Sequence, residues 1–207
     1  MQKLFRTMAC TALVGTIALA SSGCGGDATS PKIRLSDAPA ILDLSTELGT
    51  GFERLDAAAE GMSNRDMQLG SDFSEVQVFL SAEPYQMVFT YMAVVERRSD
   101  QVAQDAFMRD EKQIRQLVVE NLQQGASEEG VDVSDAKVEI TYPTLGDQAV
   151  LGTGSFTASS VGIGFDLLMF RSQTVLVFVA SVYLPGENKG LLPVGTGIEQ
   201  RIKSFGQ

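Results

Sequence analysis

The chain has 207 residues, and its 16 Lys and Arg against 26 Asp and Glu give a net charge of −10. This charge argues against nucleic-acid binding, which depends on Lys and Arg at phosphates, and against docking on anionic lipid headgroups by charge alone. The chain has no histidine, and its cysteines are Cys10 and Cys24. A mature chain that starts at Cys24 has no imidazole and no pair of thiols. It therefore lacks the groups for a Ser-His-Asp triad, a structural disulfide or an ordinary zinc site.

Residues 1–23 have the pattern of a bacterial secretory leader. Lys3 and Arg6 precede an apolar run over residues 7–20, and the small residues 21–23 follow. As a helix this run would span ~21 Å at ~1.5 Å per residue, which is short of the ~30 Å hydrocarbon core of a bilayer. We therefore predict a signal peptide over residues 1–23 and not a permanent membrane span.

The small residues directly before Cys24 resemble the lipobox of bacterial lipoproteins, although Ser21 stands where that pattern usually has leucine. In that family the cysteine becomes the first mature residue and carries acyl chains. The resemblance implies that Cys24 is the lipid-attachment residue and that the protein is exported and anchored on the extracytoplasmic face of a membrane. Each buried methylene of the acyl chains contributes ~0.8 kcal/mol to such an anchor. The alternative is cleavage near Ala20 and a soluble secreted protein.

Residues 24–36, rich in Gly, Ser, Thr and Pro, are predicted to form a flexible tether, and residues 37–207 a single domain. ILDLSTELGTGFERLD, with glycines at 49 and 51, predicts a short opening strand or hairpin. EVQVFLSA and YQMVFTYMAVVE alternate in polarity on either side of Glu83-Pro84, which predicts a β-hairpin.

An amphipathic helix is predicted from about Asp100 to Gln124, because apolar residues recur there at spacings of three and four. Four strands follow, KVEITYP, AVLGTGSFTA, VGIGFDLLMFR and TVLVFVASVYL, and the last is predicted to be central in the sheet. Ser172-Gln173 joins the last two strands as a two-residue loop without the glycine that such turns favour. A final helix is predicted from Val194 to Phe205. This order predicts an α+β fold, in which a long helix and a C-terminal helix pack on an antiparallel sheet.

Three stretches resemble Mog1/PsbP-like domains, which recur in small bacterial lipoproteins of unassigned role: ITYPTLGDQAV, LLMFRSQTVLVFVASVY with the terminal helix, and the opening LSTELGTGFERLD. The resemblance covers most of residues 42–205. Relatives often place Gly-Asn between the last two strands, where this chain has Ser172-Gln173. The resemblance implies an αβα sandwich that docks to partners or supports assemblies, and it supplies no catalytic residue.

Three motifs have both a functional and a simpler structural interpretation. The loop GASEEGVDVSD gathers Glu128, Glu129, Asp132 and Asp135, whose oxygens suit calcium, but their spacing differs from that of an EF-hand. GTGSFTASSVGIG lacks the Lys and the strand-to-helix transition of a phosphate loop, so its glycines indicate bulges, bends or close backbone approach. Asp147 is either a lone acid at a cleft or a turn aspartate bonded to its own backbone.

The sequence therefore predicts a non-catalytic, lipid-anchored domain that binds a protein partner or a small ligand at the cell envelope. It predicts Cys24 as the lipid-attachment residue, no cofactor, no metal and no nucleic-acid partner. Two alternatives remain open. One is a hydrolase that uses paired carboxylates, although no pair can be named among the 26 acidic residues. The other is a calcium-stabilised structural module.

Overall fold

A computed structural model describes residues 33–55, 73–82, 85–94, 132–173, 175–184 and 190–205, and within 112–123 the helical residues 112, 115, 116, 118–120 and 123. The predicted signal peptide, Cys24 and most of the predicted tether lie outside the described residues. Most of the predicted helix from Asp100 to Gln124 lies outside them as well. Every residue that is described between 112 and 123 is helical, as predicted.

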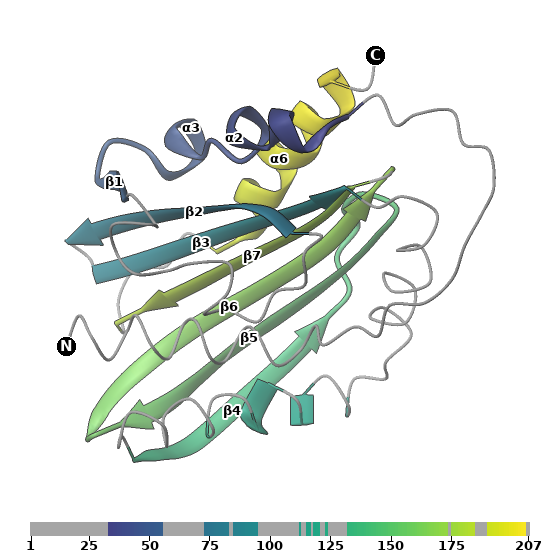
Figure 1. The fold of residues 1–207 in the computed structure, drawn as a ribbon. Helices are drawn as coiled ribbons and strands as arrows, with labels where there is room; N and C mark the ends of the chain where they lie inside the picture. Colours follow the sequence, from purple (N-terminus) through teal and green to yellow (C-terminus); the bar gives the residue numbers. More distant parts are fainter. Residues whose placement is uncertain are drawn as a thin grey trace.

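In the described part of the chain, seven antiparallel strands form one sheet in the order β1-β2-β3-β7-β6-β5-β4 (Figure 1). The strands are β1 (Phe52–Leu55), β2 (Phe73–Ala82), β3 (Tyr85–Val94), β4 (Val133–Thr141), β5 (Gln148–Ala158), β6 (Val161–Ser172) and β7 (Val175–Tyr183). Consecutive hairpins join β2 to β3 and β4 through β7, and the pairing of β3 with β7 unites the two groups. The predicted α+β class, with its antiparallel sheet, is confirmed.

The predicted strands all form, and β7 is the central strand, buried along most of its length. The loop between β6 and β7 lies one residue later than predicted, because Ser172 already pairs with Val175. Gln173 in this loop has a φ of 56°, in the left-handed region that usually requires glycine. The missing glycine is thus tolerated by a strained glutamine.

The opening segment is more helical than predicted. It forms η2 (Leu35–Asp37), α2 (Ala38–Ile41) and α3 (Ser45–Leu48) before the short strand β1. Ile33, which the sequence placed in the tether, is 1% exposed and belongs to the hydrophobic core. The folded part of the chain therefore includes the last residues of the predicted tether.

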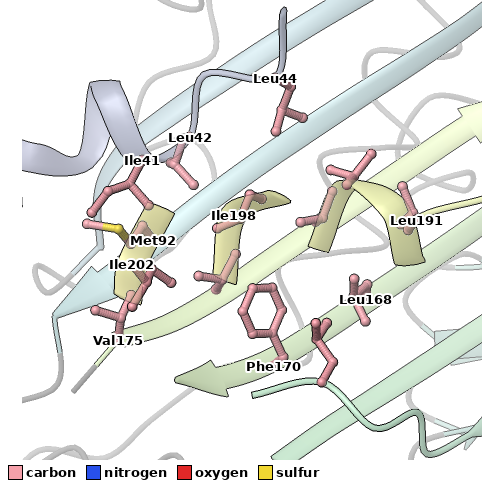
Figure 2. Packing of buried hydrophobic residues seen from close by; sticks show 14 of the residues in the cluster. Ile41, Leu42, Leu44, Met92, Leu168, Phe170, Val175, Leu191, Ile198 and Ile202 are labelled. Atoms are coloured by element: carbon pink, nitrogen blue, oxygen red, sulfur yellow. The ribbon is translucent and has the colours of Figure 1, made fainter. Parts of the chain in front are cut away.

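The C-terminal helix is confirmed as α6 (Leu192–Phe205), which packs with α2 and α3 on one face of the sheet, called here the helix-side face (Figure 1). Ile198 and Ile202 are fully buried there with residues of the central strands (Figure 2). Burial of each such side chain stabilises the fold by about 1.5–3 kcal/mol. A methyl group on Gly195 would lie 2.6 Å from Leu168 Cδ2, so glycine lets α6 approach the sheet closely.

The opposite face of the sheet is also buried. Its most buried apolar residues are Met87, Phe89, Phe156, Ala158, Ile163, Phe165, Leu176 and Ala180. The rings of Phe156 and Phe165 lie 6.0 Å apart between centroids. Val118, in the helical segment within 112–123, is 2% exposed. Among the described residues, no helix has the length and hydropathy needed to cross a membrane.

Candidate functional site

The helix-side face of the sheet has two chemically different ends. At one end the paired residues are apolar, with Met92 opposite Val177 and Val177 opposite Phe170. We call this the junction end, because two turns and α6 meet beside it. At the opposite end of the same strands the buried side chains are polar. This polar end consists of Ser81, Gln86, Asp166, Ser181 and Tyr183, contributed by β2, β3, β6 and β7.

Hydrogen bonds connect the side chains of the polar end across neighbouring strands. Gln86 Nε2 donates to Ser181 Oγ at 2.8 Å, and the Tyr183 hydroxyl donates to Asp166 Oδ1 at 3.4 Å. Gln86, Asp166 and Ser181 are at most 4% exposed. Burial of polar groups is costly unless they are hydrogen-bonded, so these contacts hold the polar end together.

Gly164 makes room for the Tyr183 ring. The two residues pair across β6 and β7, and a Cβ atom on Gly164 would overlap the ring. In the same way, a Cβ on Gly154 would overlap the Phe165 ring and the Lys137 carbonyl. The glycine-rich run GTGSFTASSVGIG thus forms parts of β5 and β6 and allows close packing, as its simpler interpretation predicts.

Asp166 is the only buried charged residue in the part of the chain that the structure describes. It was not among the site residues predicted from the sequence. In VGIGFDLLMFR, Asp166 stands two residues before Leu168 and four before Phe170, so the three side chains point to the same face of the strand. This spacing is the signal that could have revealed it. Because both neighbours point to the core, an acid in register with them is expected to be buried.

Asp147 is a structural residue of the junction end. Its backbone N–H donates to the Arg171 carbonyl at 2.7 Å, and its Oδ2 accepts from the Gln173 N–H at 2.8 Å. The Arg171 guanidinium lies 3.9 Å from the same oxygen. The aspartate therefore binds the backbone of the β6–β7 hairpin, 26 residues away, where the sequence suggested a bond to its own local backbone. Its half-exposed carboxylate holds two turns together.

Gly146 fixes the geometry of this junction. Its φ is 58°, and a Cβ atom there would overlap the carbonyl oxygen of Arg171. Its N–H donates to Glu199 Oε1 of α6 at 3.1 Å. Leu145, directly before it, is buried against Gly195 of α6. The LGD stretch of ITYPTLGDQAV is thus a structural junction between two turns and the C-terminal helix.

A second polar contact joins α6 to the N-terminal helices. Arg201 Nη1 lies 2.5 Å from Glu47 Oε1, and Arg201 Nε donates to the Ile41 carbonyl at 2.8 Å. Both side chains are mostly buried, which makes this pair more consequential than an exposed one. Gly197 makes room for Glu47, since a Cβ there would overlap the carboxylate. The contact connects segments that are more than 150 residues apart in the sequence.

Asp43 precedes α3 and accepts a hydrogen bond from the Ser45 N–H at 3.0 Å. The backbone and side-chain hydrogen bonds from Ser45 lower the pKa of Asp43, and the positive charges of Arg201 and Arg54 lower it further. The carboxylate is therefore held in its charged form at the start of the helix.

The predicted calcium loop is only partly described. Glu128 and Glu129 lie outside the described residues, while Asp132 and Asp135 are exposed. Asp135 has a φ of 55° at an irregularity in the pairing of β4 with β5, between Ser134 and Lys137. Within the described ranges, no group of three or more Asp, Glu, Cys or His side chains is arranged to hold a metal ion.

The polar end offers a carboxylate, an amide and hydroxyl groups, which are hydrogen-bonding groups suited to recognition or to structure. The junction end uses its polar groups to hold turns and a helix in place. Comparisons of the chain with protein-family models and with curated proteins found no match. The function is therefore argued from the residues of this chain.

Proposed function

We propose that the protein is a lipid-anchored extracytoplasmic domain of Mog1/PsbP-like architecture that binds a protein partner or a small ligand at the cell envelope. One observation carries the proposal. Cys24 follows a leader-like segment, and only residues 25–32 separate it from Ile33, which is 1% exposed in the core. A chain arranged in this way joins a lipid-attachment residue to a folded domain through a short connection.

Two features support the Mog1/PsbP-like architecture. The strand order and the C-terminal helix agree with the element order on which the resemblance rests. Both faces of the sheet are buried, which is what a sheet between two helical layers requires.

The chemistry of the chain favours binding over catalysis. The sequence has no histidine and no cysteine after residue 24, so the common nucleophile–base pairs have no candidates there. A carboxylate-dependent hydrolase would instead need two acids about 5–9.5 Å apart. Asp166, the buried carboxylate of the described residues, has a phenol as its hydrogen-bonded neighbour.

Metabolic labelling with a fatty acid tests the lipid anchor. The wild-type protein should incorporate the label and fractionate with membranes, and Cys24→Ser should lose both properties. Cys10→Ser is the matched control, because it removes the other cysteine, which lies within the predicted leader, and it should keep the label. Label retained in Cys24→Ser, or absent from the wild type, would refute the anchor.

Capture from native membranes tests the binding role. The lipidated protein, solubilised in detergent, should retain one defined partner or ligand at constant stoichiometry, and an excess of free domain should compete for it. Turnover of a hydrolase substrate that is lost in Asp166→Asn, with the fold intact, would favour the hydrolase instead. A melting temperature raised by calcium would favour the calcium module, because a ligand selective for the native state stabilises it.

A further inference from the structure

The structure fixes the point where the chain between Cys24 and the domain ends. Ile33 is buried in the same hydrophobic cluster as Ile41 and Ile202, so the chain is held in the core at this residue. Fully extended, the chain from Cys24 to Ile33 spans at most about 32 Å at ~3.5 Å per residue. For the flexible tether that the sequence predicts over these residues, the mean distance between the ends would be only about 17 Å.

The surface around this point consists of η2, α2 and the last turn of α6, and we call it the anchor face. The first described residues and the C-terminal end of α6 lie at the same corner of the molecule (Figure 1), and α2 contacts α6. Phe205 in the last turn is 42% exposed, and Arg34 and Ser36 beside Ile33 are exposed as well. The anchor face therefore presents an aromatic ring and two cations to its surroundings, against one half-buried acid, Asp37.

The β4 edge of the sheet has a different character. It is four strand positions from β3, against which η2 packs, and thus about 19 Å away at ~4.8 Å per strand. Three of the four charged residues from Asp132 to Glu139 are acidic, and all four are exposed. Anionic headgroups repel such an edge within a Debye length of about 10 Å.

We infer that the anchor face lies against the bilayer and that the β4 edge points away from it. This inference rests on the proposed acylation of Cys24. The short connection keeps Ile33 close to the membrane, and the exposed Phe205 ring gains by contact with the headgroup region. The acidic β4 edge is repelled by the same surface, so tether length and charge favour one orientation. A partner at the envelope would then find the β4 edge accessible.

Depth-dependent fluorescence quenching tests this orientation. Ser36→Cys and Ser134→Cys form a matched pair, since both serines are exposed and lie on the anchor face and on β4 respectively. The full lipidated protein, with Cys24 blocked by its acyl chains, would carry an environment-sensitive fluorophore at either position. It would be reconstituted in vesicles of phosphatidylcholine and phosphatidylglycerol that contain a lipid-bound quencher.

The expected result is a large loss of fluorescence at position 36 and little loss at position 134. Equal quenching at the two positions, or stronger quenching at 134, in protein that floats with the vesicles would overturn the orientation and leave the lipid anchor standing. Protein that carries no acyl chain and does not float with the vesicles would overturn the proposed function, and the orientation with it. Phe205→Ser should reduce quenching at position 36 without releasing the protein from the vesicles.

Discussion

The junction end and the polar end belong to the same face of the same strands, yet they are built from opposite chemistry. At the junction end, Phe170 and Val177 are fully buried beneath the helices, and backbone groups of two turns are fixed by Asp147. At the polar end, Gln86 and Asp166 are buried to a similar degree. Burial of apolar surface stabilises a fold, whereas a buried hydrogen bond contributes a net ~1 kcal/mol. The junction end should therefore account for most of the stability of this face.

The contrast also bears on function. A buried polar cluster adds little stability, so stability alone does not explain it. Such a cluster can instead fix one arrangement of the strands or serve recognition. The junction end has a sufficient explanation in packing alone. Substitutions at the two ends should therefore differ in what they change: free energy of unfolding at the junction end, and binding as well as local order at the polar end.

The largest effect is expected at the core of the junction end. Phe170→Ala should lower the free energy of unfolding by about 3–5 kcal/mol, because the ring is fully buried and its removal leaves a cavity. Phe205→Ala is the matched control on α6, where the ring is 42% exposed, and it should cost less than about 0.5 kcal/mol. Denaturant titration of both variants measures the difference. Equal losses would contradict the packing assigned to Phe170.

A smaller effect is expected at the turn that joins this end to α6. Gly146→Ala should cost about 2–4 kcal/mol, because alanine is strained at positive φ and its Cβ would overlap the Arg171 carbonyl. Gly190→Ala is a close control: its φ is also positive, at 68°, but nothing lies within 4 Å of the added carbon. It should cost only about 1 kcal/mol, from strain alone. Thermal unfolding that shifts equally in both variants would remove the steric argument.

At the polar end, a double-mutant cycle measures the Gln86–Ser181 hydrogen bond directly. Gln86→Ala and Ser181→Ala should each destabilise the domain, and the coupling between them should be about 1 kcal/mol. A coupling near zero would mean that the two buried side chains are satisfied by other groups. A second cycle, with Gln86→Ala and Ser81→Ala, gives the coupling of Gln86 with the serine opposite it on β2 for comparison.

The two hairpin loops of β6 offer a stabilising counterpart to these losses. At the tip near the polar end, Ser159 and Ser160 both have positive φ, at 48° and 72°, which suits Asn-Gly far better than Ser-Ser. Replacement by Asn-Gly should raise the free energy of unfolding by about 0.5–1 kcal/mol. Gln173→Gly, in the loop at the junction end, should do the same by a similar amount. A loss at either tip, measured by thermal unfolding, would contradict the backbone geometry assigned there.

Local pattern was enough to predict the strands and the C-terminal helix, because alternation and apolar spacing survive in the fold. The register between β3 and β7, which brings Gln86 beside Ser181, joins residues 95 positions apart and has no local signal. The turn role of Asp147 was within reach, but its partner Gln173 lies in another hairpin. Ile33 was assigned to the tether because its neighbours are polar and glycine-rich, and only the tertiary packing shows it buried. The parts of the site that depend on neighbouring residues could be predicted from the sequence, and the contacts between distant segments could not.

The smallest effect is expected at the start of α3, the short helix that precedes β1. The Ser45 hydrogen bonds, with Arg201 and Arg54, lower the pKa of Asp43 in the folded protein. A lowered pKa means that the folded state binds this proton less tightly than the unfolded state, so the stabilisation is present above the unfolded pKa of about 3.9 and is lost as pH falls through the folded value.

Asp43→Asn should therefore be slightly less stable than the wild type at neutral pH, by well under about 1 kcal/mol, because the asparagine carbonyl can still accept the hydrogen bond from the Ser45 N–H. The gap between the two proteins should stay constant down to about pH 5 and close below about pH 4, which denaturant titrations over that range would measure. Ser45→Ala is the matched control, because it keeps the backbone hydrogen bond and removes only the side-chain one. A gap that widens on acidification would mean that the carboxylate is destabilised by the fold, and that the charges of Arg201 and Arg54 do not reach it.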